Sequence, residues 1–155
     1  MYVLSNQIIF FSSRSENNHG QQDTVKCGDL CVFNRVDDWS KCLIGRITQF
    51  SYLAGNKRER QYSSDFVDMT KPSFKTIGVF ANWFEGTNYE EIADTVKFKP
   101  LDLLFTPGYL SMEHYVCCIN DSFLVFDKDF SFSAPTDLLA NVLPKWRDRI
   151  TFDLF

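Results

Sequence analysis

The sequence predicts a mainly β fold: a small, strongly bent antiparallel barrel with extra strands and a C-terminal helix. Short apolar runs rich in β-branched and aromatic residues follow one another along the chain, separated by segments that contain Gly, Asn or Asp. Aromatic residues make up 16% of the chain, and sixteen of them are Phe. Flat side chains of this kind pack well on the pleated faces of a sheet.

The chain is long enough for one domain with a sizeable core. It has 155 residues, of which 45% are hydrophobic. We expect a single domain over residues 1–155. Within it, residues 1–25 form an N-terminal strand and a polar linker, residues 26–126 form the barrel, and residues 135–150 form the helix.

Turn signals separate the predicted strands. Gly28-Asp29 marks a turn before the first barrel strand, and residues 54–57 form a hairpin turn. Gly45 lies inside the longest strand and indicates a bulge or a tight corner there. Strict alternation along this strand places Ile44 and Phe50 on the same face. Strands are expected at 30–35, 42–52, 58–63, 76–84, 98–105, 115–119 and 123–126.

A helical period of apolar residues appears near the C-terminal end. Thr136 is placed to cap this helix, and Pro144 is expected to kink or split it. We expect the helix to cover an open end of its own barrel. The alternative is that its apolar face, with Trp146, docks another protein. The residues at helical spacing are Leu138, Leu139, Val142, Leu143, Trp146 and Ile150.

Charge is distributed unevenly along the chain. Residues 1–75 hold ten Lys or Arg against eight Asp or Glu, whereas residues 76–155 hold six against twelve. A nucleic-acid-binding domain usually shows a basic excess. The acidic second half therefore favours a cationic partner.

The cysteines indicate reduced, buried thiols. They are five in number and lie in apolar, strand-like runs. No Cys-x-x-Cys pair occurs, so no metal site is expected. The N-terminal residues lack the basic segment of a signal peptide, and no run approaches the roughly 20 apolar residues that span a bilayer. We expect a soluble protein of the nucleus or cytoplasm, with no membrane partner.

The order of these patterns resembles that of a bromo-adjacent homology (BAH) domain. The matching stretches would cover about residues 26–126. Tudor and PWWP barrels share the first half of the pattern, so the fold expected is a bent SH3-like or BAH-like barrel. The stretches are Gly28–Val32, Ile44–Phe50, Val79–Phe84 with the acidic residues after it, Leu101–Thr106 and Tyr115–Cys118.

The resemblance implies a chromatin-associated or protein-interaction module. Some BAH domains read methylated histone lysine with an aromatic cage, and others serve as protein contacts. Trp83 or Phe84 would match the cage aromatics of the family, and Trp39 lies near the place of another cage ring.

The residues themselves also supply the groups of a cage. A methylated ammonium is held by the faces of several aromatic rings, with a carboxylate nearby. Trp39, Trp83, Phe84, Tyr89 and Glu85 are the candidates for binding such a peptide. The competing interpretation places these rings in the core, because a chain so rich in aromatic residues buries most of them.

Two alternatives to a peptide reader remain open. The first is a structural protein–protein interaction domain of a larger protein, without a ligand pocket. The second is contact with nucleic acid through the hairpin tip that carries Lys57, Arg58 and Arg60.

Enzymatic chemistry has little support in the sequence. His114 lies close to Cys117 and Cys118, but no third group is placed to orient it as a base. No glycine-rich phosphate loop follows a strand. We therefore predict a non-enzymatic interaction module without a cofactor, whose partner is a protein or peptide such as a histone tail.

Overall fold

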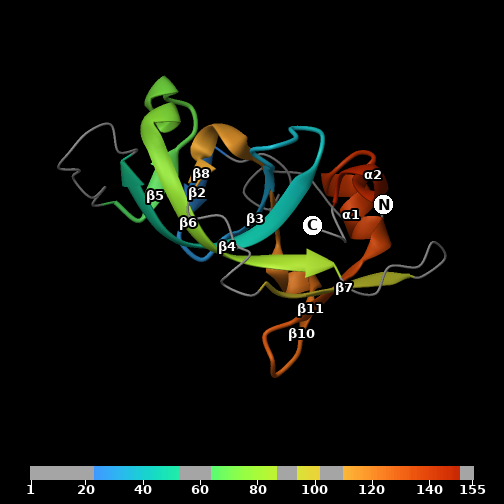
Figure 1. The fold of residues 1–155 in the computed structure, drawn as a ribbon. Coiled ribbons are helices and arrows are strands. Elements are labelled where there is room, and N and C mark those ends of the chain that lie inside the picture. The colour runs from blue at the N-terminus through green and yellow to red at the C-terminus, as the bar shows by residue number, and fades with distance from the viewer. Residues whose placement is uncertain (1–22, 53–63, 87–93, 102–109, 151–155) are drawn as a thin grey trace.

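The fold is a mainly β arrangement around one curled antiparallel sheet (Figure 1). The structure is a computed structural model, and it describes residues 23–52, 64–86, 94–101 and 110–150. The sheet has eight strands in the order β10-β11-β7-β6-β4-β3-β9, with β8 paired to β6, and a separate two-stranded sheet pairs β2 with β5. The prediction of a mainly β, barrel-like fold with a C-terminal helix is confirmed.

The elements follow the chain closely. The strands are β2 (Thr24–Lys26), β3 (Leu30–Asn34), β4 (Cys42–Tyr52), β5 (Phe66–Asp68), β6 (Ile77–Gly86), β7 (Thr95–Pro100), β8 (Leu110–Ser111), β9 (Tyr115–Ile119), β10 (Val125–Phe126) and β11 (Phe132–Pro135). The helices are α1 (Thr136–Val142), α2 (Trp146–Arg149) and the 3₁₀ turns η2 (Pro72–Thr76), η4 (Met112–His114) and η5 (Asp121–Phe123).

Most predicted strands lie where the pattern placed them. The predicted strand 42–52 is β4, and 115–119 is β9. The predicted turn and strand over 54–63, and the end of the predicted strand 98–105, lie outside the described residues. The turn at Gly28 is present: Gly28 has φ +95°, a conformation open to glycine, and the Asp29 carboxylate accepts from the Lys26 N–H at 2.9 Å.

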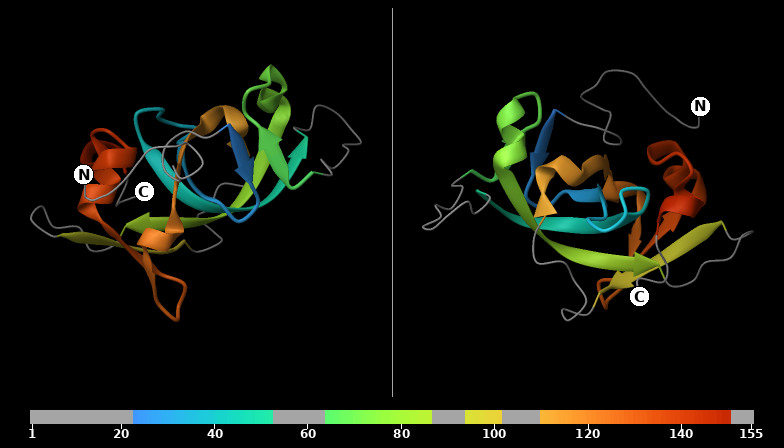
Figure 2. Two further views of the ribbon diagram at one scale, coloured as in Figure 1. Left: turned by 180° about the vertical axis from the view of Figure 1, so that it is seen from behind. Right: turned by 45° about the horizontal axis from the view of Figure 1, so that its top comes forward.

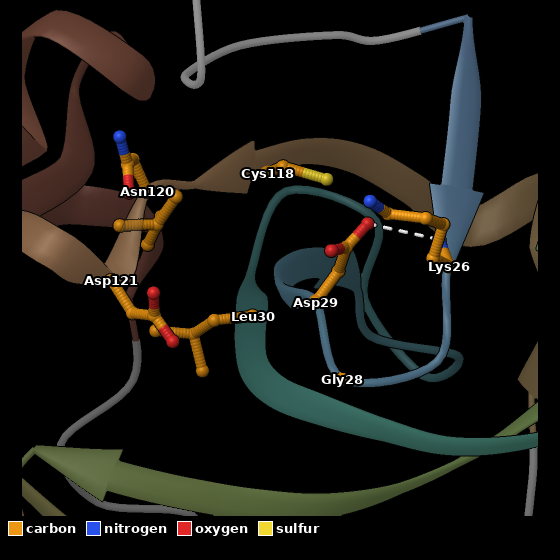
Figure 3. A pocket seen from close by; sticks show the side chains of 8 residues that line it. Lys26, Gly28, Asp29, Leu30, Cys118, Asn120 and Asp121 are labelled. Carbon is orange, nitrogen blue, oxygen red and sulfur yellow. Dashed lines mark hydrogen bonds between the residues drawn. The ribbon is translucent and has the colours of Figure 1, made fainter.

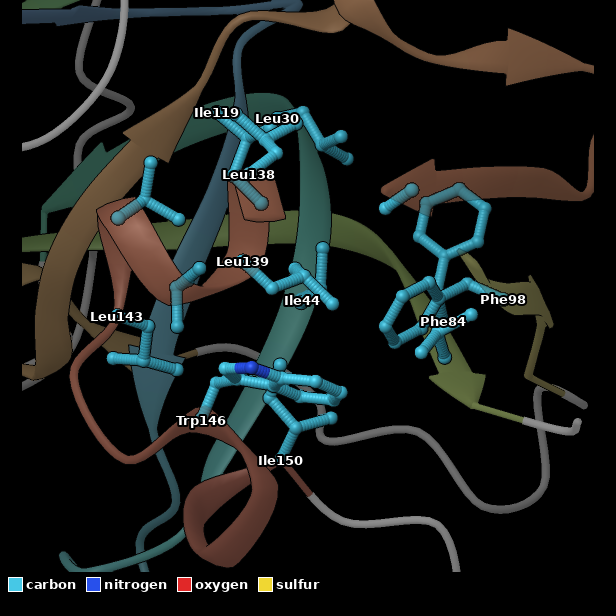
Figure 4. Packing of buried hydrophobic residues seen from close by; sticks show 14 of the residues in the cluster. Leu30, Ile44, Phe84, Phe98, Ile119, Leu138, Leu139, Leu143, Trp146 and Ile150 are labelled. Atoms are coloured by element: carbon cyan, nitrogen blue, oxygen red, sulfur yellow. The ribbon is translucent and has the colours of Figure 1, made fainter. Parts of the chain in front are cut away.

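Both faces of the sheet are apolar, and each carries its own core. One core lies between the sheet and the C-terminal helices and includes Ile44, Phe84 and Trp146 (Figure 4). The other lies on the opposite face, towards the small β2-β5 sheet, and includes Ile47 and Trp83. The two views of Figure 2 show the helices at one end of the curled sheet and β2, β5 and η2 towards the other.

A β-bulge sets which face each residue of β4 joins. The register of β4 against β6 shifts between Ile47 and Gln49, and the Thr48 hydroxyl donates to the Phe80 carbonyl at 3.1 Å. An extra residue reverses the alternation beyond it. Phe50 therefore packs in the core of Ile47, and the prediction that it shares a face with Ile44 is wrong.

Gly45 serves close packing, and the bulge that the sequence indicated at this position lies further along. Gly45 is the register partner of Trp83 across β4 and β6. A Cβ on residue 45 would lie 2.6 Å from Cε3 of the Trp83 ring and 2.8 Å from Cζ3. Only glycine lets the indole lie against the strand at this distance.

The C-terminal helix is split, as Pro144 predicted. α1 ends at Val142 and α2 begins at Trp146, with Lys145 in the left-handed region at φ 59°. The prediction that Thr136 caps the helix is wrong: its N–H and hydroxyl both donate to the Asp94 carbonyl, at 2.9 and 3.2 Å, and anchor the helix start to the residue before β7. The helices bury Leu138, Leu139, Val142 and Trp146 against their own sheet, so they cover it as expected.

Gly45→Ala tests the close packing of Trp83. We expect this substitution to lower the free energy of unfolding by about 1–3 kcal/mol, because the new methyl group overlaps a fully buried ring. Denaturant unfolding of the wild type and the variant measures the difference.

The same substitution in a Trp83→Leu background is the control. In this background, Gly45→Ala should lower the free energy of unfolding by clearly less, because the indole ring that the new methyl group would overlap is absent. An equal cost in both backgrounds would show that Gly45 is required for another reason.

Candidate interaction surfaces

The two neighbouring aromatic residues predicted for a cage are core residues. Trp83 is 2% exposed and Phe84 is 7% exposed. Trp83 packs edge-on against Phe33, with ring centroids 5.5 Å apart, and Phe84 packs edge-on against Phe132 at 4.9 Å. Successive residues of a strand point to opposite faces, and here both faces are covered. Neither ring presents an open face to a ligand.

The other predicted cage residues do not gather with these two. Glu85 forms an ion pair with Lys99 across β6 and β7, with 3.7 Å between Oε2 and Nζ. Tyr89 lies outside the described residues. Within the described part of the chain, the predicted cage residues therefore do not line one cleft.

Trp39 has the exposure that the other candidates lack. It lies between β3 and β4 and is 52% exposed. One face of its ring packs on His114 of η4, with centroids 4.5 Å apart at an angle of 30°. The Nδ1 atom of His114 lies 3.1 Å from the Asn34 carbonyl oxygen, which fixes the imidazole. The indole is thus held on one side and open on the other.

The two carboxylates before Trp39 are already held by neighbours. Asp37 accepts from Arg35 at 2.9 Å (Nε) and 2.6 Å (Nη2), and these charge-assisted bonds lower the pKa of its carboxyl group. Asp38 accepts from the hydroxyl and the N–H of Ser40, which lowers its pKa as well. Both groups are therefore ionised at neutral pH beside the exposed indole.

The basic hairpin tip lies outside the described residues. Lys57, Arg58 and Arg60 all fall within residues 53–63. Contact with nucleic acid through this tip stays a prediction from the sequence.

The segment 123–130 carries exposed apolar side chains that sequence reasoning missed. Val125 is 68% exposed and Phe130 76% exposed, and Phe123 and Phe126 are also exposed. The sequence predicts a strand at 123–126 but does not show which of its apolar side chains face solvent. The signal that could have revealed their exposure is the charged stretch that follows, Asp127–Asp129. A charged turn directly after a short apolar strand indicates a hairpin at the edge of a sheet, where side chains can face solvent.

These side chains lie on a hairpin at the end of the sheet. β10 is the last strand, pairing only with β11 in the described sheet, with Phe126 opposite Phe132. The Asp127 N–H donates to the Ser131 carbonyl at 2.8 Å and closes the turn. Phe130 has φ 69°, which is rare for a residue with a bulky side chain. Figures 1 and 2 show this hairpin projecting away from the rest of the fold.

Arg46 ties the base of the hairpin to the barrel. Its guanidinium carbon lies 5.3 Å from the centroid of the Phe126 ring. Its Nη1 atom donates to the Gly28 carbonyl at 2.9 Å and to Asp121 at 3.0 Å. Lys97 and Asp127 form a second ion pair at 3.3 Å. These contacts fix the base of the hairpin, which carries the exposed apolar side chains, to the sheet.

A small polar hollow lies beside the start of β3 (Figure 3). Its volume is about 130 Å³, and its lining includes Lys26, Asp29, Cys118 and Asp121. A volume of this size holds a few waters or one small molecule.

In the part of the chain that the structure describes, no three His, Cys, Asp or Glu side chains gather where they would hold a metal ion. None of the described helices combines the length and the apolar character needed to cross a membrane.

Comparison with protein-family models, with curated proteins and with solved structures finds no match to this chain. The resemblance to BAH domains therefore stays a prediction from the sequence.

The different burial of two tryptophans gives a direct test. Trp83→Ala should lower the free energy of unfolding by about 3–5 kcal/mol, because it empties a fully buried ring site. Trp39→Ala should cost less than about 1 kcal/mol, because the indole is half exposed. Denaturant unfolding of both variants measures the contrast. Similar losses in the two variants would contradict the burial described above.

Proposed function

We propose that this chain is a non-enzymatic protein-interaction domain that docks its partner through the β10-β11 hairpin. The observation that carries the proposal is the set of exposed apolar side chains between the end of η5 and the hairpin turn, Phe123, Val125, Phe126 and Phe130. Contiguous exposed apolar side chains mark protein interaction sites in soluble proteins. Exposed Phe side chains also supply large contact areas at low entropic cost.

Phe130 is the anchor of this proposed contact. Its side chain is the most exposed of the large hydrophobic residues in the described chain, and its backbone is held in a sparsely populated conformation. Such conformations are kept where the surrounding structure determines them and cluster at functional positions. An aromatic anchor of this kind fits an apolar pocket on a partner protein.

Charged side chains surround the apolar residues of the hairpin and form the rim of the proposed contact surface. Asp121 and Asp127 are engaged by Arg46 and Lys97, and Asp129 accepts from the Ser131 N–H at 3.0 Å. Lys128 and Asp129 place opposite charges at the turn. A rim of both signs suits a protein surface and gives no continuous basic stripe for nucleic acid. The occupant proposed is therefore a protein with an apolar pocket bordered by charged residues of both signs.

Selection from a library of displayed random peptides tests this function. The selected peptides should carry aromatic or aliphatic residues, and Phe130→Ala should weaken their binding at least tenfold. Because Phe130 is exposed, the thermal midpoint of this variant should stay within a few degrees of the wild type.

Phe66→Ala is the matched control. Phe66 is also an exposed Phe, but it lies on β5, in the separate two-stranded sheet. Its substitution should leave binding unchanged. If binding survives Phe130→Ala and Val125→Lys, the hairpin is not the docking surface.

A cationic or methylated lysine peptide is the second candidate ligand. It is supported by the exposed Trp39 ring, which packs on His114 and directly follows the ionised Asp37 and Asp38 in the chain. An array of modified histone peptides tests it. Methylation-dependent binding that Trp39→Ala removes would support a chromatin reader acting in the nucleus. Binding unchanged in Trp39→Ala would refute this site.

A further inference from the structure

Two buried cysteines face each other across neighbouring strands. Cys31 of β3 and Cys118 of β9 are register partners in the antiparallel pair. Their sulfur atoms lie 3.1 Å apart, closer than two thiols in ordinary van der Waals contact. The sequence separates them by 87 positions, so only the fold brings them together.

The strand geometry already meets the requirements of a disulfide bond. Directly opposed residues of antiparallel strands have Cα atoms about 4.5–5.5 Å apart. The Cα atoms of disulfide-bonded cysteines are usually about 4.4–6.8 Å apart. Joining the two sulfur atoms therefore needs a small rotation of the side chains and no movement of the strands.

One of the two buried cysteines, Cys118 at 3% exposed, borders a polar hollow. Cys118 lines the polar hollow shared with Lys26 and Asp29 (Figure 3), whereas Cys31 is completely buried. The Tyr115 hydroxyl lies 3.4 Å from the Cys118 sulfur. Burial, with a contribution from Cys118, raises the pKa of Cys31 well above that of an ordinary thiol. Cys31 thus stays protonated behind the more accessible sulfur.

We propose that Cys31 and Cys118 form an intramolecular disulfide when a small peroxide enters this hollow. The Cys118 sulfur attacks one oxygen of hydrogen peroxide, the O–O bond breaks, and a sulfenic acid and water form. The Cys31 sulfur then attacks the Cys118 sulfur and displaces hydroxide, which leaves as water with the Cys31 proton. Two thiols and one peroxide give one disulfide and two waters.

The neighbouring Cys117 supplies a built-in contrast. Its side chain lies on the opposite face of β9, in the core beneath the helices. Its sulfur donates to the Val142 carbonyl at 3.4 Å. Burial raises the pKa of Cys117 to about 12. Cys117 is not among the residues that line the hollow, so it lacks the position of Cys118. Adjacent cysteines therefore have different expected fates.

The bond would lock an edge of the barrel. β9 is the outermost strand on its side of the described sheet, and it pairs with β3. A cross-link between these strands closes a long chain segment and restricts the unfolded state. The oxidised protein should therefore unfold at a higher temperature than the reduced protein.

The test treats the full chain with hydrogen peroxide under native conditions. Thiol titration after unfolding should show the loss of two of the five thiols. Peptide mapping without reductant should find Cys31 joined to Cys118, and the thermal midpoint should rise until reductant is added. Circular dichroism recorded during the treatment shows that the chain stays folded.

Substitutions distinguish this pair from the other cysteines. Cys31→Ala and Cys118→Ala should each abolish the linked peptide, and Cys117→Ala should leave it in place. If either of the first two variants fails to fold, peptide mapping of the wild type still decides. Oxidation confined to Cys27, a link between other cysteines, or a link that appears only after unfolding would each overturn the proposal.

Discussion

The close packing of Trp83 on Gly45 is the constraint on which the rest of the structure depends. It joins the two longest strands, β4 and β6, at the centre of the sheet. The bulge beyond Ile47 then turns Phe50 to the same face as Trp83. With large side chains fixed on both faces of one curled sheet, each face needs a cover. The C-terminal helices provide one, and the region of β2 and β5 provides the other.

Because both faces of the sheet are covered, side chains that can contact a partner lie at its edges and in its loops. Large side chains that project from the central strands enter one core or the other, so neighbours such as Trp83 and Phe84 are separated by the sheet itself. Side chains at strand ends and on edge strands escape this rule. The exposed Trp39 lies between two strands, the exposed hairpin lies at one end of the sheet, and the opposed thiols join the strand at the other end. The proposed contacts use these positions, whereas the proposed disulfide would join the edge strand β9 to β3 from within the core.

The sequence predicted the strands better than it predicted their faces. β4 and β9 were found because alternating apolar residues and turn signals bound them on both sides. The face of Phe50 could not be found, because a bulge has no signature beyond its effect on register. Gly45 was predicted to mark a bulge or a tight corner, but it admits the Trp83 ring, a neighbour that is visible only in the fold. The cage prediction named Trp83 or Phe84, and it needed one face of the strand to be open, whereas both faces are covered. The exposed Phe130 was missed because composition alone does not distinguish a ring that faces solvent from a ring that faces the core.

The central claim is that Trp83 and Phe84 belong to the core while Trp39 and Phe130 face solvent. Attenuation of aromatic proton signals by a soluble gadolinium chelate, measured by NMR on the whole chain, tests it most directly. We predict strong attenuation for Trp39 and Phe130 and little for Trp83 and Phe84. Equal attenuation of the Trp83 and Trp39 indole signals would contradict the account, since it would place Trp83 on an open face and restore it as a ligand-binding ring.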